Sequence, residues 1–171
     1  MNMSDAQLVI DLPPDRLLQL LRGLLRDGRP LTVPVTGWSM TPTIRSGDVL
    51  TIAPASMRAP RWGDVVVFRD PAGRLRMHRV VGRMAGAPPQ LRVRGDNSRG
   101  ADPPVPTDAV LGVVIAISRG GRPRRFGLGA ERYALAAAAR LGLLRPLLHA
   151  GHRLRRRFPS ASAPFSGDSH S

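Results

Sequence analysis

Apolar residues in the central part of the chain occur in short runs separated by turn-forming residues. The runs are Leu31–Val35, Val49–Ala53, Val65–Phe68, Leu75–Val81, Leu91–Val93 and Val110–Ile117. Short runs rich in valine, isoleucine and leucine are typical of β-strands, and the Gly-Asp and Asp-Pro pairs between them are typical of turns. The pattern therefore predicts a mainly β domain of about six strands within residues 30–119.

The two ends of the chain follow a helical pattern instead. Leucines recur at helical spacing between Pro14 and Gly28, which predicts an amphipathic helix within residues 1–29. This helix is expected to pack on the β domain, with docking on a membrane or a partner as the alternative. Residues 120–158 are predicted to form a basic linker and an amphipathic helix from about Glu131 to Leu148, and residues 159–171 a disordered tail.

Positive charge is concentrated near the end of the chain. The net charge is +14, and Arg119–Arg157 contains eleven arginines and a single acidic residue, Glu131. An Arg-rich amphipathic helix can bind anionic lipid, so residues 131–157 predict reversible attachment to an anionic membrane surface. The alternative is a helix that closes over the β domain. A nucleic-acid partner is not expected, because about thirty residues before the β domain are too few for a helix-turn-helix unit.

Absent segments and residue types restrict the location and the chemistry. No signal peptide or membrane span is visible, so we expect a cytoplasmic protein, peripheral on the membrane if it binds there. The chain has no cysteine and no lysine, which excludes disulfides, thiolate metal sites and a lysine base. No metal or cofactor is expected, since His149 and His152 lack a third ligand and fit a solvated helix end.

A candidate nucleophile stands in the segment 36–44. Ser39 follows Gly37 in a turn and precedes Met40 and Pro42, and the proline stiffens a loop that can present the hydroxyl in a cleft. Taken alone, a serine in a turn is most often only a turn residue. His78, within the fourth apolar run, is by itself most often a partly buried strand histidine.

Several motifs follow one another in the order of a known family. They are Gly37-Trp38-Ser39-Met40-Thr41-Pro42 with Gly47-Asp48-Val49 downstream, Gly63-Asp64-Val65, His78-Arg79-Val80-Val81-Gly82, Arg94-Gly95-Asp96-Asn97 and Gly112-Val113-Val114. Over Leu31–Ser118 this arrangement resembles the type I signal peptidase superfamily, which also includes the self-cleaving SOS-response repressors. The resemblance implies a compact, coiled, barrel-like β core and serine peptidase activity.

The resemblance also implies roles for individual residues. Ser39 corresponds to the nucleophile and His78 to the base, because bacterial signal peptidases carry lysine at the latter position and the endoplasmic-reticulum and archaeal type carries histidine. A neutral imidazole, with an ordinary pKa of about 6.5, can accept a serine proton at pH 7. Asp102 is expected to orient the base and Asp96 to shape its loop; turn capping is the alternative for Asp96.

The residues around Ser39 are expected to bind substrate. Trp38, Met40 and Pro42 are the candidates, and the first two are predicted to line a groove beside Ser39 instead of filling the core. The chain departs from the bacterial signal peptidases at Gly37, where they carry a serine that helps to stabilise the oxyanion. The backbone N–H of Ser39 then acts alone or with another donor.

The predicted function is limited proteolysis of a signal peptide, a leader peptide or a partner protein. Cleavage is expected after a small side chain, through an acyl-enzyme at Ser39. The substrate is expected to bind in an extended conformation, as a strand added to the sheet near Ser39. The alternatives are a non-catalytic binding module and a repressor-like regulator with the same fold.

Overall fold

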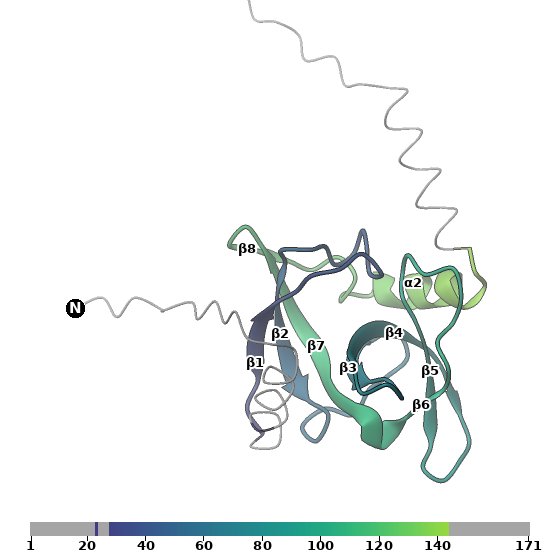
Figure 1. The fold of residues 1–171 in the computed structure, drawn as a ribbon. Helices are drawn as coiled ribbons and strands as arrows, with labels where there is room; N and C mark the ends of the chain where they lie inside the picture. Colours follow the sequence, from purple (N-terminus) through teal and green to yellow (C-terminus); the bar gives the residue numbers. More distant parts are fainter. Residues whose placement is uncertain (1–22, 24–27, 144–171) are drawn as a thin grey trace, which may run out of the picture.

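A computed structural model describes Gly23 and residues 28–143 (Figure 1). The strands are β1 (Leu31–Pro34), β2 (Val49–Pro54), β3 (Val65–Arg69), β4 (Leu75–Met84), β5 (Gln90–Arg94), β6 (Val105–Pro106), β7 (Val110–Arg119) and β8 (Arg122–Arg124). The described helices are the short 3-10 helix η1 (Thr107–Ala109) and the α-helix α2 (Glu131–Arg140). The protein is therefore mainly β, as the apolar runs predict.

All of these strands belong to one antiparallel sheet that curls into a half-barrel (Figure 1). The strand order is β1-β2-β7-β3-β4-β5-β6, and β8 pairs with β7. Each of the six predicted strands is present, which confirms the coiled β architecture. The sequence prediction lacks β6 and β8. The latter lies in the segment predicted as a linker, where Arg122–Arg124 pair with Ile117–Arg119 and extend the sheet past residue 119.

The core is divided between the two faces of the curled sheet. Successive side chains of a strand point to opposite faces, so along β3 Val65 and Val67 enter one apolar cluster while Val66 and Phe68 enter another. The first apolar cluster consists of Met40, Ile44, Leu50, Ile52, Val65, Val67, Val114 and Ile117. Because Met40 and Ile44 come from the loop between β1 and β2, this cluster anchors the segment that contains Ser39.

Helix α2 packs against β4 through small side chains. Ala136 and Ala139 are buried, and Ala139 contacts Val81 of β4. The helix begins where the sequence predicts and ends at Arg140, while the predicted range continues to Leu148, beyond the last described residue. Within the described part of the chain, no helix has the length and apolarity needed to span a membrane.

Three sequence predictions fall wholly or largely outside the described residues. They are the amphipathic helix within residues 1–29, the Arg153–Arg157 end of the basic segment and the disordered tail 159–171. The membrane attachment predicted for residues 131–157 rests partly on these residues and stays a prediction.

Candidate active site

Ser39 lies in the loop that joins β1 to β2. Two backbone hydrogen bonds close this loop: the N–H of Thr41 donates to the carbonyl of Trp38 at 3.2 Å, and that of Ile44 to the carbonyl of Met40 at 3.0 Å. Met40 and Ile44 are buried in the first apolar cluster, whereas Ser39 is exposed. The apolar residues therefore fix the loop, and Ser39 stays accessible at its surface.

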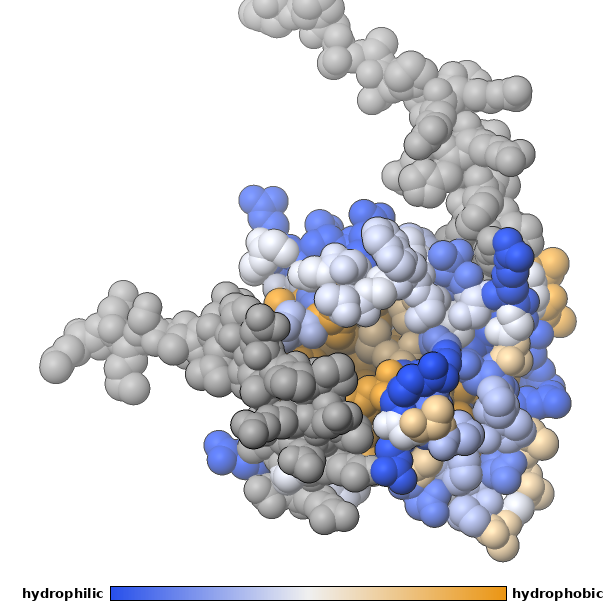
Figure 2. All heavy atoms as spheres, viewed as in Figure 1, coloured by the Kyte–Doolittle hydropathy of each residue, from blue (hydrophilic) through white to orange (hydrophobic). Residues whose placement is uncertain are grey.

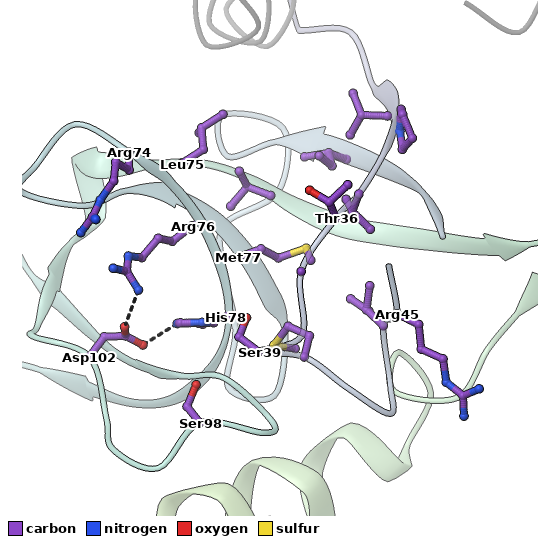
Figure 3. A pocket seen from close by; sticks show the side chains of 18 residues that line it. Thr36, Ser39, Arg45, Arg74, Leu75, Arg76, Met77, His78, Ser98 and Asp102 are labelled. Carbon is purple, nitrogen blue, oxygen red and sulfur yellow. Dashed lines mark hydrogen bonds and ion pairs between the residues drawn. The ribbon is translucent and has the colours of Figure 1, made fainter. Parts of the chain in front are cut away.

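His78 extends from β4 and contacts a carboxylate. Its Nδ1 lies 2.5 Å from Oδ2 of Asp102, which belongs to the loop between β5 and β6. Because the carboxylate accepts, we assign the hydrogen to Nδ1, which leaves the lone pair on Nε2. Figure 3 shows the imidazole ring between Asp102 and Ser39. Carboxylate, imidazole and hydroxyl thus follow in the order of a serine–histidine–aspartate triad.

Gly95 allows the Ser39 loop to approach the imidazole closely. A Cβ atom added to Gly95 would lie 2.7 Å from the Ser39 carbonyl oxygen and 3.0 Å from Nε2 of His78. Contacts this short do not fit a packed interior, so a larger residue would push the two segments apart. The backbone N–H of Asn97 donates to the same Ser39 carbonyl at 2.7 Å. The loop that follows β5 therefore fastens the serine loop beside His78.

A cavity of about 520 Å³ opens beside these residues. Its apolar lining consists of Val33, Pro34, Val35, Met40, Ile44, Ile52, Val67, Leu75 and Met77. Ser39, His78 and Asp102 line the same cavity, together with Ser98. Figure 2 shows apolar side chains at the bottom of a hollow in the curled sheet. A bound molecule would therefore meet an apolar wall next to the polar groups.

The three residues predicted to bind substrate have different positions. Trp38 is 74% exposed and, like Pro42, does not line the cavity, so substrate binding by these two residues stays a prediction. Met40 does line the cavity, but it also fills the core, since it is 2% exposed within the first apolar cluster. The tight turn explains the difference, because it directs Met40 inward and leaves its neighbour Trp38 outside.

Asp96 makes a separate, buried ion pair. Its carboxylate accepts hydrogen bonds from Nε and Nη2 of Arg79 at 2.8 and 2.7 Å, and from the Thr43 hydroxyl at 2.6 Å. Neither charged side chain is exposed to solvent. The side-chain hydrogen bonds of Asp96 are thus with Arg79 and Thr43 and not with His78, and a catalytic role for Asp96 stays a prediction. The expectation that it shapes the loop agrees with this ion pair.

Arg76 also faces the cavity, although the sequence analysis does not single it out. Its Nε donates to Oδ2 of Asp70 at 2.9 Å, and its Nη1 lies 3.9 Å from Oδ1 of Asp102. The hydrogen bond from Arg76, with further hydrogen bonds from Arg74, lowers the pKa of Asp70 from its ordinary 3.8 to about 2. Strand alternation could have identified Arg76, because residues 76 and 78 share one face of β4.

The backbone around Ser39 bears on oxyanion stabilisation. Within residues 28–143, no group accepts a hydrogen bond from the Ser39 N–H. Gly37 has a φ of 119°, where a residue with a side chain is strained. The glycine that departs from the bacterial signal peptidases is thus required by the conformation of this loop.

Together these groups can perform acyl transfer to water. Ser39 supplies a hydroxyl, His78 a proton acceptor, Asp102 a carboxylate that orients the ring, and the Ser39 N–H a hydrogen-bond donor. Among the described residues, no group of three or more histidine or carboxylate side chains is placed to hold a metal ion.

Comparison with known proteins identifies a family that covers this site. The family described as Peptidase S24-like matches residues 7–115. The match covers more than half of the chain and includes Ser39, His78 and Asp102. Among curated proteins, no match was found.

Proposed function

Because the chain belongs to the Peptidase S24-like family, we propose that it is a serine endopeptidase with Ser39 as nucleophile and His78 as general base. Asp102 orients the imidazole. The observation that carries the proposal is the 2.5 Å contact between His78 Nδ1 and Asp102, which leaves Nε2 as the proton acceptor on the side of Ser39. Lysine, the other base of the superfamily, is absent from the chain.

The reaction takes place in two halves. His78 Nε2 takes the Ser39 proton as Oγ bonds to the scissile carbonyl carbon, and the Ser39 N–H faces the oxyanion. The imidazolium then gives its proton to the leaving amine, the C–N bond breaks, and an ester remains on Ser39. In the second half His78 takes a proton from water, the hydroxide attacks the ester, and Ser39 regains a proton as the acid leaves.

The substrate is an extended segment of a peptide or protein. Strand β1 pairs only with β2 among the described strands, so its other edge can accept an added strand. Val33 and Val35, in and directly after β1, line the cavity beside Ser39. We therefore place the substrate backbone along β1, with its side chains against the apolar wall.

A fluorophosphonate probe tests the proposed nucleophile, because it forms a covalent bond only with an activated serine hydroxyl. We expect labelling of the full chain, complete loss in Ser39→Ala and strong loss in His78→Ala. Ser98→Ala is the matched control, since Ser98 lines the same cavity, and it should retain labelling. Mass spectrometry of the labelled peptide identifies the site.

Two outcomes would overturn the proposal. Equal labelling of Ser39→Ala and the unaltered chain would remove Ser39 as nucleophile. Absence of labelling in a folded chain, together with absence of cleavage of unstructured protein substrates, would leave the non-catalytic binding module as the better assignment.

A further inference from the structure

Three polar side chains at the start of β4 and just before it line the cavity. Arg74, in the turn before β4, and Arg76 and His78 of β4 alternate along the chain with the apolar residues Leu75 and Met77 (Figure 3). Two carboxylates, Asp70 and Asp102, lie beside this row. Positive and negative groups therefore alternate from the turn after β3 to the imidazole.

Asp102 stands at the centre of this charged row. One of its oxygens, Oδ2, lies 2.5 Å from His78 Nδ1, and the other, Oδ1, lies 3.9 Å from Arg76 Nη1. Its side chain is 14% exposed, so the carboxylate is partly shielded from water. The guanidinium is therefore the nearest fixed positive charge to the oxygen that His78 does not use.

Arg76 is itself fixed by Asp70. Its Nε donates to Asp70 Oδ2 at 2.9 Å, while the other oxygen of Asp70 accepts the backbone N–H of Arg74 at 2.9 Å. Asp70 also closes the turn between β3 and β4, because its own N–H donates to the Arg74 carbonyl at 2.9 Å. The hydrogen-bonded turn thus holds Nε of Arg76 beside Asp70, while its Nη1 extends toward Asp102.

We infer that Arg76 is a positioning residue of the catalytic site: it holds Asp102 in line with His78 and weakens the attraction of Asp102 for a protonated imidazole. The inference rests on the proposed function of Ser39 and His78. Two effects follow. The ring keeps the orientation that proton transfer requires, and the positive charge of Arg76 offsets part of the attraction between Asp102 and an imidazolium.

The charged groups around His78 support this electrostatic effect of Arg76 on Asp102. Asp102 and Arg76 are the nearest, with Asp70 and Arg74 behind them on the turn. Among the other charged groups of the described residues, Asp96 is paired with Arg79 in the interior, and Arg45 of the Ser39 loop lines the cavity. Phe68, which packs against the ring at 6.1 Å between centroids, carries no charge.

Arg76→Gln tests the inference, with Arg74→Gln as its matched control. Both arginines face the cavity and both donate to Oδ2 of Asp70, but only Arg76 approaches Asp102. We expect Arg76→Gln to lower kcat about tenfold at similar KM and to move the rising limb of the pH–rate profile up by about half a unit. Arg74→Gln should leave the limb in place. Arg76→Lys, which keeps the positive charge, should leave the rising limb at the same pH as in the unaltered chain.

A second measurement does not depend on activity. The NMR titration of the His78 ring, assigned by its loss in His78→Ala, should show the same upward shift in Arg76→Gln and not in Arg74→Gln. Equal midpoints in the two variants, or a downward shift in Arg76→Gln, would overturn the inference. Failure of the proposed function gives a different result, namely hydrolysis that persists in Ser39→Ala.

Discussion

His78 and Arg79 are neighbours on β4, yet they enter opposite sides of the sheet and meet two different carboxylates of the same loop. Asp102 contacts His78 at the wall of the cavity, where the carboxylate side chain is 14% exposed. Asp96 forms an ion pair with Arg79 in the interior, where neither side chain is exposed. An arginine keeps its charge at all relevant pH values, whereas a histidine changes charge near neutrality. One pair is therefore suited to fixing the structure and the other to moving a proton.

The largest expected effect is the loss of activity on the cavity side. Ser39→Ala and His78→Ala should each lower kcat by about 10⁴-fold or more, and the double variant should cost little beyond either, because the two groups act as one unit. The folded state should be nearly unaffected by Ser39→Ala, since Ser39 is exposed. Peptide cleavage kinetics and thermal unfolding measure the two effects. If the loss of kcat in the double variant equalled the product of the two single losses, Ser39 and His78 would act independently and not as one unit.

A reciprocal pair of variants sharpens the comparison. Asp96→Asn should lower the free energy of unfolding by about 3–5 kcal/mol, because it leaves Arg79 as a buried charge without its counter-ion. Asp102→Asn should lower it by only about 1 kcal/mol while reducing kcat at least a hundredfold. Denaturant unfolding and cleavage rates, measured on both variants, give the result. If Asp102→Asn were the more destabilising variant, the assignment of a structural role to Asp96 and a catalytic role to Asp102 would be wrong.

The smallest expected effect concerns Asp70. Like Asp96, it accepts hydrogen bonds from arginine; like Asp102, it lies beside Arg76 of the cavity. Its pKa in the folded state is about 2, below the ordinary 3.8, because Arg76 and Arg74 donate to it. A lowered pKa means that ionised Asp70 stabilises the fold above about pH 4, and this contribution is lost as the pH falls toward 2. Asp70→Asn should therefore flatten the dependence of Tm on pH in this range.

The control for this experiment is Asp108→Asn, which alters an exposed carboxylate on η1. It should leave the acid limb of the Tm curve unchanged. An equal flattening by both variants would mean that the ion pairs of Asp70 add nothing to acid stability.

The sequence predicts the strands well where they are apolar and poorly where they are short. The run Val65–Phe68 identifies β3 because a strand buried on both faces has no polar positions. Strand β6 consists of Val105 and Pro106 alone, and β8 of Arg122–Arg124 is exposed throughout, so neither carries an apolar pattern. Pairing with β5 and β7 defines them instead, and pairing depends on contacts distant in sequence.

The candidate site shows the same division between local and distant information. The motif order points to Ser39 and His78, which the structure brings to one cavity. Two aspartates of one loop are hard to separate by sequence, because their partners on β4 are defined by the fold. The exposure of Trp38 and the burial of Met40 depend on the direction of a tight turn, which their apolar character does not reveal.

The guanidinium of Arg79 has a consequence for how the molecule opens. It donates to the carbonyls of Gly63 and Gly127, and through Asp96 it reaches the hydroxyl of Thr43, four residues after Ser39. The turn before β3, the segment before α2 and the serine loop are therefore joined at one point. Detaching any of them alone would break charged hydrogen bonds in the interior, so exchange of the hydrogen-bonded amides of Thr41 and Ile44 in the serine loop is expected to follow global unfolding and not a local fluctuation.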